Sequence, residues 1–195
     1  YGENGRQREA LLAAAFKKAK PAGWHLDERR AFFEEEAWWL GSFALYSAIK
    51  KSRGGEPFFA WPEPLKKRDD AALAEFARTH ADDIELEIFI QYLFARDLAD
   101  LHAYANERGV ALMGDLPIFV AHDSSDVWAQ PEVFQIDERG ELRAVAGVPP
   151  DAFSDEGQLW GNPLYDWDHA ARTGYRFWIE RLRHAMRGFD SVRLD

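Results

Sequence analysis

The stretch "VALMGDLPIFV", residues 110–120, decides the fold that the sequence predicts. It is an apolar run with β-branched residues at its ends, which is typical of a strand in a parallel sheet. The preceding residues 83–108 predict a long helix, and Gly109 follows it as a C-cap. A long helix, a capping glycine and an apolar strand together indicate an αβ unit.

A second strand is predicted at the end of the sequence, in "FDSVRLD", residues 189–195. Residues 121–173 are rich in turn formers and predict a long loop, and residues 174–188 predict a helix. Strand, loop, helix and strand in this order form a βαβ crossover, which joins parallel neighbours. The fold class is therefore α/β, and the loop leaves the same edge of the sheet that Asp195 reaches.

The sequence before Val110 is predicted to be helical. Besides the long helix, apolar periodicity and breakers predict helices over residues 6–20, 27–51 and 69–79. Asp27 is a candidate N-cap for the second of these. Residues 56–70, "EPFFAWPEPLKKRDD", contain three prolines and predict an irregular connection.

Composition limits the function classes. Of the 195 residues, 47% are hydrophobic and 30% are charged, which suits a folded globular chain, and the formal net charge is −10. That charge repels phosphates, so we expect neither nucleic acid nor an anionic membrane as a partner. The sequence has no cysteine and no apolar run of ~20 residues, which favours a cytoplasmic protein. Scattered histidines and missing nucleotide-binding motifs predict no metal and no cofactor.

The strand ends carry the candidate catalytic groups. With a period of two, Arg193 and Asp195 share one face of the last strand, and Asp115 follows Gly114 in the other. A guanidinium beside a carboxylate favours the ionised acid that a glycosidase-type nucleophile requires. The alternatives are a structural ion pair for Arg193 and Asp195, and a local turn acceptor for Asp115.

The loop segment "GVPPDAFSDEGQLWGNPLYDW", residues 147–167, has the side chains that sugars require. Gln158 and Asn162 donate and accept hydrogen bonds, Asp151 accepts them, and Trp160 offers a flat apolar face. The alternative is an ordered loop that is packed by its own aromatic residues. His122, which follows the first strand, is a weaker candidate for a ligand contact.

Three segments in order resemble one family: "GDLPIFVAHDSSDVWAQPEVFQID", "VAGVPPDAFSDEGQLWGNPLYDWD" and "FDSVRLD". They are similar to the 4-α-glucanotransferases, also called amylomaltases or disproportionating enzymes, of the α-amylase clan. The resemblance implies a partial (β/α)8 barrel with about two barrel strands in residues 110–195. It also implies that residues 1–109 form a helical subdomain inserted in the barrel.

The resemblance also implies roles for the candidate residues. The family's nucleophile falls on Asp195 and its active-site arginine on Arg193, while Asp115 lies near the donor glucose. Three loop residues match the lining of the sugar subsites: Asp151, Gln158 and Trp160. The implied activity is retaining transfer of α-1,4-glucan segments, with maltodextrins as partners.

The family also needs a Glu acid/base, which this sequence lacks. We therefore expect the chain to be an internal segment of a longer enzyme and to be inactive alone. Three other functions stay open from the residues: a glucan-binding segment, an α-glucan hydrolase of the same clan, and a helical scaffold without activity.

Overall fold

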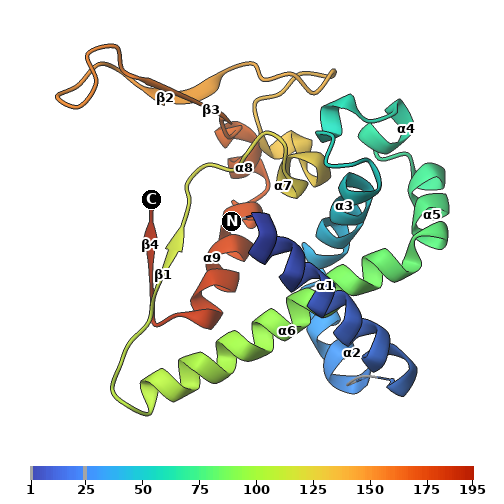
Figure 1. The fold of residues 1–195 in the computed structure, drawn as a ribbon. Helices are drawn as coiled ribbons and strands as arrows, with labels where there is room; N and C mark the ends of the chain where they lie inside the picture. Colours follow the sequence, from blue (N-terminus) through green and yellow to red (C-terminus); the bar gives the residue numbers. More distant parts are fainter. Residues whose placement is uncertain (1, 24–25) are drawn as a thin grey trace.

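The computed structural model describes residues 2–23 and 26–195, in which two parallel strands form the first sheet. Strand β1, Met113–Leu116, pairs with β4, Ser191–Leu194, so that Met113 faces Ser191. Helix α9, Arg176–Gly188, returns the chain between them and contacts both strands (Figure 1). The predicted βαβ crossover is therefore confirmed, although β1 occupies only the middle of the predicted apolar run.

The part of the chain before Gly109 that the structure describes is mainly helical, as the sequence predicts, and the connection at residues 56–70, expected to be irregular, contains two short helical elements. The elements are α1 (Gly2–Ala19), η1 (Lys20–Ala22), α2 (Leu26–Glu35), α3 (Leu40–Ser52), η2 (Phe58–Ala60), α4 (Glu63–Lys66), α5 (Asp70–Thr79) and α6 (Ala81–Asn106). Helix α6 runs diagonally across the molecule, and α1 and α3 both contact it (Figure 1).

The prediction of one helix over residues 27–51 is wrong, because a turn at residues 36–39 separates α2 from α3. Trp39 leaves the helical region with φ −133°, and its indole N–H donates to Glu36 at 2.5 Å. The Glu36 carboxylate also accepts from His184 and Arg187 of α9. These tertiary contacts stabilise the turn. Asp27 lies inside the first turn of α2 and is not its N-cap.

Gly109 closes α6 as predicted. Its φ of +70° is a left-handed conformation that favours glycine. The Gly109 N–H donates to the Asn106 carbonyl, and the Val110 N–H donates to the Ala105 carbonyl, both at 3.0 Å. This pair of bonds is a Schellman motif, which ends the helix and directs the chain toward β1.

The expectation of a long loop over residues 121–173 is wrong in part, because much of the connection is regular. It contains α7 (Ser125–Ala129), η3 (Pro131–Val133), β2 (Val145–Val148), β3 (Gln158–Pro163) and α8 (Trp167–Arg172). Strands β2 and β3 form an antiparallel hairpin that projects from the helices (Figure 1). Gly147 permits the close pairing, since a Cβ there would lie 2.5 Å from the Gln158 carbonyl oxygen.

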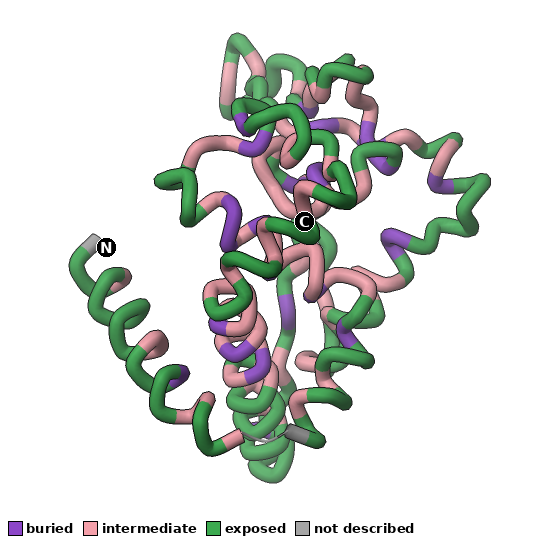
Figure 2. The backbone as a smooth tube through the Cα atoms, turned by 90° about the vertical axis from the view of Figure 1, so that its right-hand side faces the viewer, coloured by how far each residue is buried: buried purple, intermediate pink, exposed green. Residues whose placement is uncertain are grey.

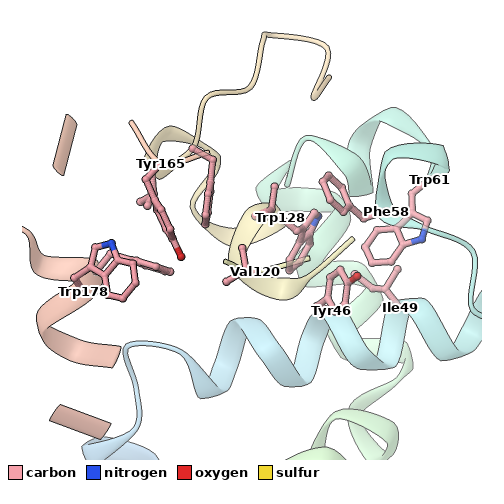
Figure 3. Packing of buried hydrophobic residues seen from close by; sticks show 12 residues of the cluster. Tyr46, Ile49, Phe58, Trp61, Val120, Trp128, Tyr165 and Trp178 are labelled. Atoms are coloured by element: carbon pink, nitrogen blue, oxygen red, sulfur yellow. The ribbon is translucent and has the colours of Figure 1, made fainter. Parts of the chain in front are cut away.

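One hydrophobic core joins residues from both sides of Gly109. Tyr46, Phe58 and Trp61 pack with Trp128 and its neighbours, and Trp61 and Trp128 lie 5.8 Å apart between ring centroids (Figure 3). The same core continues through Tyr165 to Trp178 of α9. The predicted division at residue 109 therefore does not coincide with a gap in packing, and it stays a prediction.

A smaller cluster attaches the first helix. Phe16 of α1 packs with Leu86, Phe89 and Tyr92 of α6, whereas most of α1 is exposed (Figure 2). None of the described helices is long and apolar enough to cross a membrane.

Candidate active site

Three charged side chains meet at the carboxyl ends of the parallel strands. Asp115 and Arg193 are register partners in β1 and β4, so the sheet places them side by side. The guanidinium of Arg193 binds Asp115 through two hydrogen bonds, of 3.0 Å from Nε and 2.6 Å from Nη2. The same Nη2 donates to Asp195 Oδ2 at 2.9 Å. Arg193 therefore holds two carboxylates together: the strand spacing predicts its contact with Asp195, whereas its contact with Asp115 is seen only in the structure.

The electrostatics follow from these contacts. The hydrogen bond from Arg193 holds the pKa of Asp115 below its usual value. The hydrogen bond to Asp115, with the charges of both carboxylates, raises the pKa of Arg193. The three side chains are 55–66% exposed, so the cluster is open to a ligand from solvent. An ion pair this exposed adds little to stability, which favours a role other than holding the fold.

The main chain of Asp195 is fixed by β1. Its N–H donates to the Leu116 carbonyl at 3.1 Å, and its carbonyl accepts from the Ile118 N–H at 2.5 Å. Ile118 belongs to the segment that links β1 to the rest of the crossover connection. The position of the Asp195 side-chain carboxylate therefore depends on residues 116–118 as well as on Arg193.

The hairpin carries two more candidate residues on β3. Trp160 is half-exposed, and its indole N–H donates to Gln158 Oε1 at 3.0 Å. Its ring meets Phe119 edge-on at 6.1 Å between centroids. Phe119 directly follows Ile118, so Trp160 of β3 lies against the segment that contacts Asp195.

Asp151 and Asn162 make contacts with the main chain. Asp151 Oδ1 accepts from the N–H groups of Phe153 and Ser154, at 2.8 and 2.9 Å, and shapes the turn between β2 and β3. Asn162 Nδ2 donates to the Val120 carbonyl at 2.8 Å. Within residues 2–23 and 26–195, no hydrogen bond or ion pair joins the hairpin candidates to Arg193 or Asp195.

His122 contacts Phe59 and Gly140 rather than the carboxylates of Asp115 and Asp195. Its ring stacks on Phe59 at 4.8 Å between centroids, and its Nε2 lies 2.9 Å from the Gly140 carbonyl oxygen. No group of three or more acidic, histidine or cysteine side chains in the described residues is arranged to hold a metal ion.

Two residues behind the site have contacts that the sequence did not predict: Tyr165, which the sequence suggested as an aromatic platform for sugar but which is buried, and Arg181. Tyr165 and Arg181 donate to carbonyl groups just after β1, at Ile118 and Pro117. Tyr165 is only one of several aromatic residues in its segment, and Arg181 is one of several arginines in α9. Both residues donate to the segment that follows β1, and this shared target is evident only from the packing of α9 beside β1.

These features define an α/β protein with a solvent-accessible carboxylate and arginine site at the carboxyl ends of parallel strands. That position is typical of active sites in parallel sheets and barrels. Residues 1–195 match the family described as 4-alpha-glucanotransferase, and the chain belongs to this family.

Individual relatives agree. The chain is 48% identical over 186 residues to the 4-alpha-glucanotransferase of Thermus thermophilus, covering 94% of this chain and 37% of that protein. It is 40% identical over 190 residues to the Aquifex aeolicus protein of the same name, covering 96% of this chain and 38% of that protein. The chain thus spans somewhat more than a third of the length of these relatives.

Solved structures show the same arrangement. An amylomaltase from Streptococcus agalactiae in complex with acarbose superimposes with a TM-score of 0.95 at 34% identity. That match covers 100% of this chain and 39% of the amylomaltase chain. The amylomaltase from Corynebacterium glutamicum, at 22% identity and a TM-score of 0.66 over 96% of this chain and 24% of that chain, shows the shared fold alone.

Proposed function

We propose that the protein carrying this chain transfers α-1,4-glucan segments to the 4-hydroxyl of an acceptor sugar. Membership of the 4-alpha-glucanotransferase family supports the reaction class. The observation that carries the proposal is Arg193, which holds Asp115 and Asp195 together at the carboxyl ends of two parallel strands. Acarbose in the related amylomaltase supports α-glucan oligosaccharides as the substrate class.

The proposed mechanism is a retaining double displacement. Asp195 attacks the anomeric carbon, so a bond forms between that carbon and the carboxylate while the glycosidic C–O bond breaks. A Glu from outside these residues protonates the leaving oxygen. The same Glu then accepts the proton of an acceptor 4-hydroxyl, whose oxygen displaces Asp195. Arg193 orients Asp195 for the attack through its hydrogen bond to Oδ2.

The remaining candidates are assigned to sugar binding. Asp115 is exposed beside Arg193 and accepts hydrogen bonds from hydroxyls of the donor sugar in this proposal. Gln158 and Trp160 lie together on β3 and offer an amide and an aromatic face. Asp151 and Asn162 form hydrogen bonds with main-chain groups, so in this proposal they hold the surface that contains Gln158 and Trp160 in place.

We also propose that the two parallel strands belong to a (β/α)8 barrel. In this proposal residues 110–195 supply about two barrel strands and residues 1–109 form an inserted helical subdomain. The parallel pairing of β1 and β4 through α9 supports it. The cytoplasm remains the proposed location, and it rests on the cysteine-free composition.

Disproportionation of maltotriose by the protein that carries this chain tests the reaction. Asp195→Asn should lower glucose release by at least about a thousandfold, because an amide is not a nucleophile. Asp168→Asn, an exposed aspartate of α8, is the matched control and should retain full activity. Wild-type activity in Asp195→Asn would refute the proposal.

A hydrolase of the same clan is the alternative, and it is distinguished by whether water or a sugar accepts the glycosyl unit; we propose that Trp160 favours the sugar. Its half-exposed ring on β3 is suited to hold an acceptor sugar and exclude water. Trp160→Ala should therefore shift products from longer glucans toward hydrolysis. An unchanged transfer-to-hydrolysis ratio would remove this role.

The 195 residues by themselves should not turn over maltodextrin, because the family's acid/base Glu is not among them. Glucose release from maltotriose by this chain alone would contradict that statement. Binding without turnover would agree with it.

A further inference from the structure

The segment after β1 continues the contact between the two strands. Ile118 donates its N–H to the Asp195 carbonyl, and Leu116 accepts from the Asp195 N–H. The pairing of β1 with β4 therefore continues one residue beyond the regular strands. Any shift of residues 117–118 would displace the main chain that carries the Asp195 carboxylate.

Side chains from elsewhere in the fold hold this segment by its carbonyl groups. Arg181 Nη2 donates to the Pro117 carbonyl at 3.1 Å, and the Tyr165 hydroxyl donates to the Ile118 carbonyl at 2.6 Å. Two residues later, Asn162 donates to the Val120 carbonyl. The three donors therefore all reach main-chain carbonyl groups of residues 117–120.

Tyr165 and Arg181 act as a unit. Arg181 Nη1 donates to the Tyr165 hydroxyl oxygen at 3.2 Å, and a guanidinium has no acceptor. The single hydroxyl proton of Tyr165 is therefore directed at the Ile118 carbonyl. Burial raises the pKa of Tyr165 to about 12, so this proton is retained at neutral pH.

Packing holds both side chains in place. The Tyr165 ring is 2% exposed and lies 5.2 Å from Phe134 and 5.0 Å from Trp178 between ring centroids. The Arg181 guanidinium lies over Phe177 and Trp178, at 5.5 and 5.0 Å from their centroids. Tyr165 therefore approaches the segment from buried surroundings, and the partly buried Arg181 is held against two aromatic rings.

We propose that Tyr165 and Arg181 are positioning residues for the nucleophile: they fix the Pro117–Ile118 main chain, which in turn fixes Asp195. The inference rests on the proposed function, because it assigns the nucleophile's role to Asp195. Neither side chain contacts substrate in this proposal. Their effect is on the direction from which the carboxylate attacks, and small misplacements of a reacting group cost rate rather than binding.

Tyr165→Phe tests the proposal by removing only the hydroxyl. In the full protein, kcat for maltotriose should fall about tenfold while KM changes less than about twofold. The same loss should occur with an α-maltosyl fluoride donor, whose leaving group needs no protonation. A defect in acid catalysis would be rescued by the fluoride, whereas a misplaced nucleophile would not.

Tyr46→Phe is the matched control. Tyr46 is also a buried core tyrosine, and its hydroxyl donates to Asp123 at 2.7 Å, away from the strand ends. The two variants should lose similar thermal stability, but only Tyr165→Phe should lose kcat. Equal kcat values for the two variants would overturn the proposal.

Arg181 supplies a second and graded test. Lysine at this position can donate to the Tyr165 hydroxyl or to the Pro117 carbonyl but lacks the planar fork that reaches both. Arg181→Lys should therefore lie between wild type and Arg181→Met in kcat. A lysine variant no better than methionine would contradict the positioning role.

Hydrogen exchange separates this inference from the proposed function. Tyr165→Phe should accelerate exchange of the Ile118 and Asp195 amides by about tenfold or more, whereas Tyr46→Phe should not. If the wild-type protein transfers no glucan, the proposed function is wrong, and exchange alone then decides the positioning. Unchanged exchange of the Ile118 and Asp195 amides in Tyr165→Phe would overturn the positioning role.

Discussion

The buried carboxylate of Glu36 should be a major local source of stability. Only 4% of Glu36 is exposed, and it accepts from Trp39 at 2.5 Å, His184 at 3.0 Å and Arg187 at 2.6 Å. These contacts join the turn between α2 and α3 to α9. Replacing Glu36 therefore perturbs the junction between the helices and the βαβ unit.

The cost of Glu36→Gln follows from the positions of the donors. Trp39 and His184 approach one oxygen and Arg187 approaches the other. A glutamine that keeps its oxygen toward Trp39 turns its NH2 group toward the guanidinium, so the Arg187 bond is lost. Arg187 retains Glu35 at 3.1 Å, which limits the penalty. We expect about 2 kcal/mol, the value of one hydrogen bond to a charged group.

Two further variants bracket that value. Glu36→Ala leaves all three donors without this acceptor and should cost about 3–5 kcal/mol. Glu35→Gln, in a largely exposed pair with the same arginine, should cost less than about 0.5 kcal/mol. Urea unfolding at fixed pH measures these differences as shifts in midpoint at constant m-value. Equal midpoints for Glu36→Gln and Glu35→Gln would refute the reasoning.

Three other perturbations have defined outcomes. Gly114→Ala places a Cβ 2.4 Å from the Phe189 ring and should lower the free energy of unfolding by about 1–3 kcal/mol, measured by urea denaturation. Gly109→Ala forces a left-handed φ on alanine and should cost about 1 kcal/mol in the same assay, with unchanged activity. Arg193 lowers the pKa of Asp115, so the stability from this pair is present above the ordinary aspartate range and is lost as pH falls through the lowered value. The stability difference between wild type and Asp115→Asn should therefore be constant near neutral pH and shrink only in acid. A difference that grew in acid would contradict the assigned direction.

Local patterns were sufficient for the elements that carry the site. The end of α6 could be predicted because Gly109 encodes its own conformation. The pairing of Arg193 with Asp195 follows from the two-residue period of a strand, and the parallel strands follow from the order of the elements. In each case the information lies within a few neighbouring residues or in the chain order.

Features that depend on distant partners could not be predicted in this way. The turn at residues 36–39 is stabilised by His184 and Arg187, which lie 148 and 151 residues from Glu36. The short strands β2 and β3 lack a clear alternation, and they pair where Gly147 permits close approach. Asn162 has the chemistry of a sugar contact, yet its amide nitrogen contacts the Val120 carbonyl.

The core shared across Gly109 has a consequence for recombination among homologues. Trp128 packs against Trp61 and also donates its indole N–H to the Leu65 carbonyl at 3.0 Å. A chimera joined at residue 109 would take these interlocking surfaces from two different parents. Crossover points that inherit residues 46–65 and 120–134 from the same parent should give the better-folded hybrids.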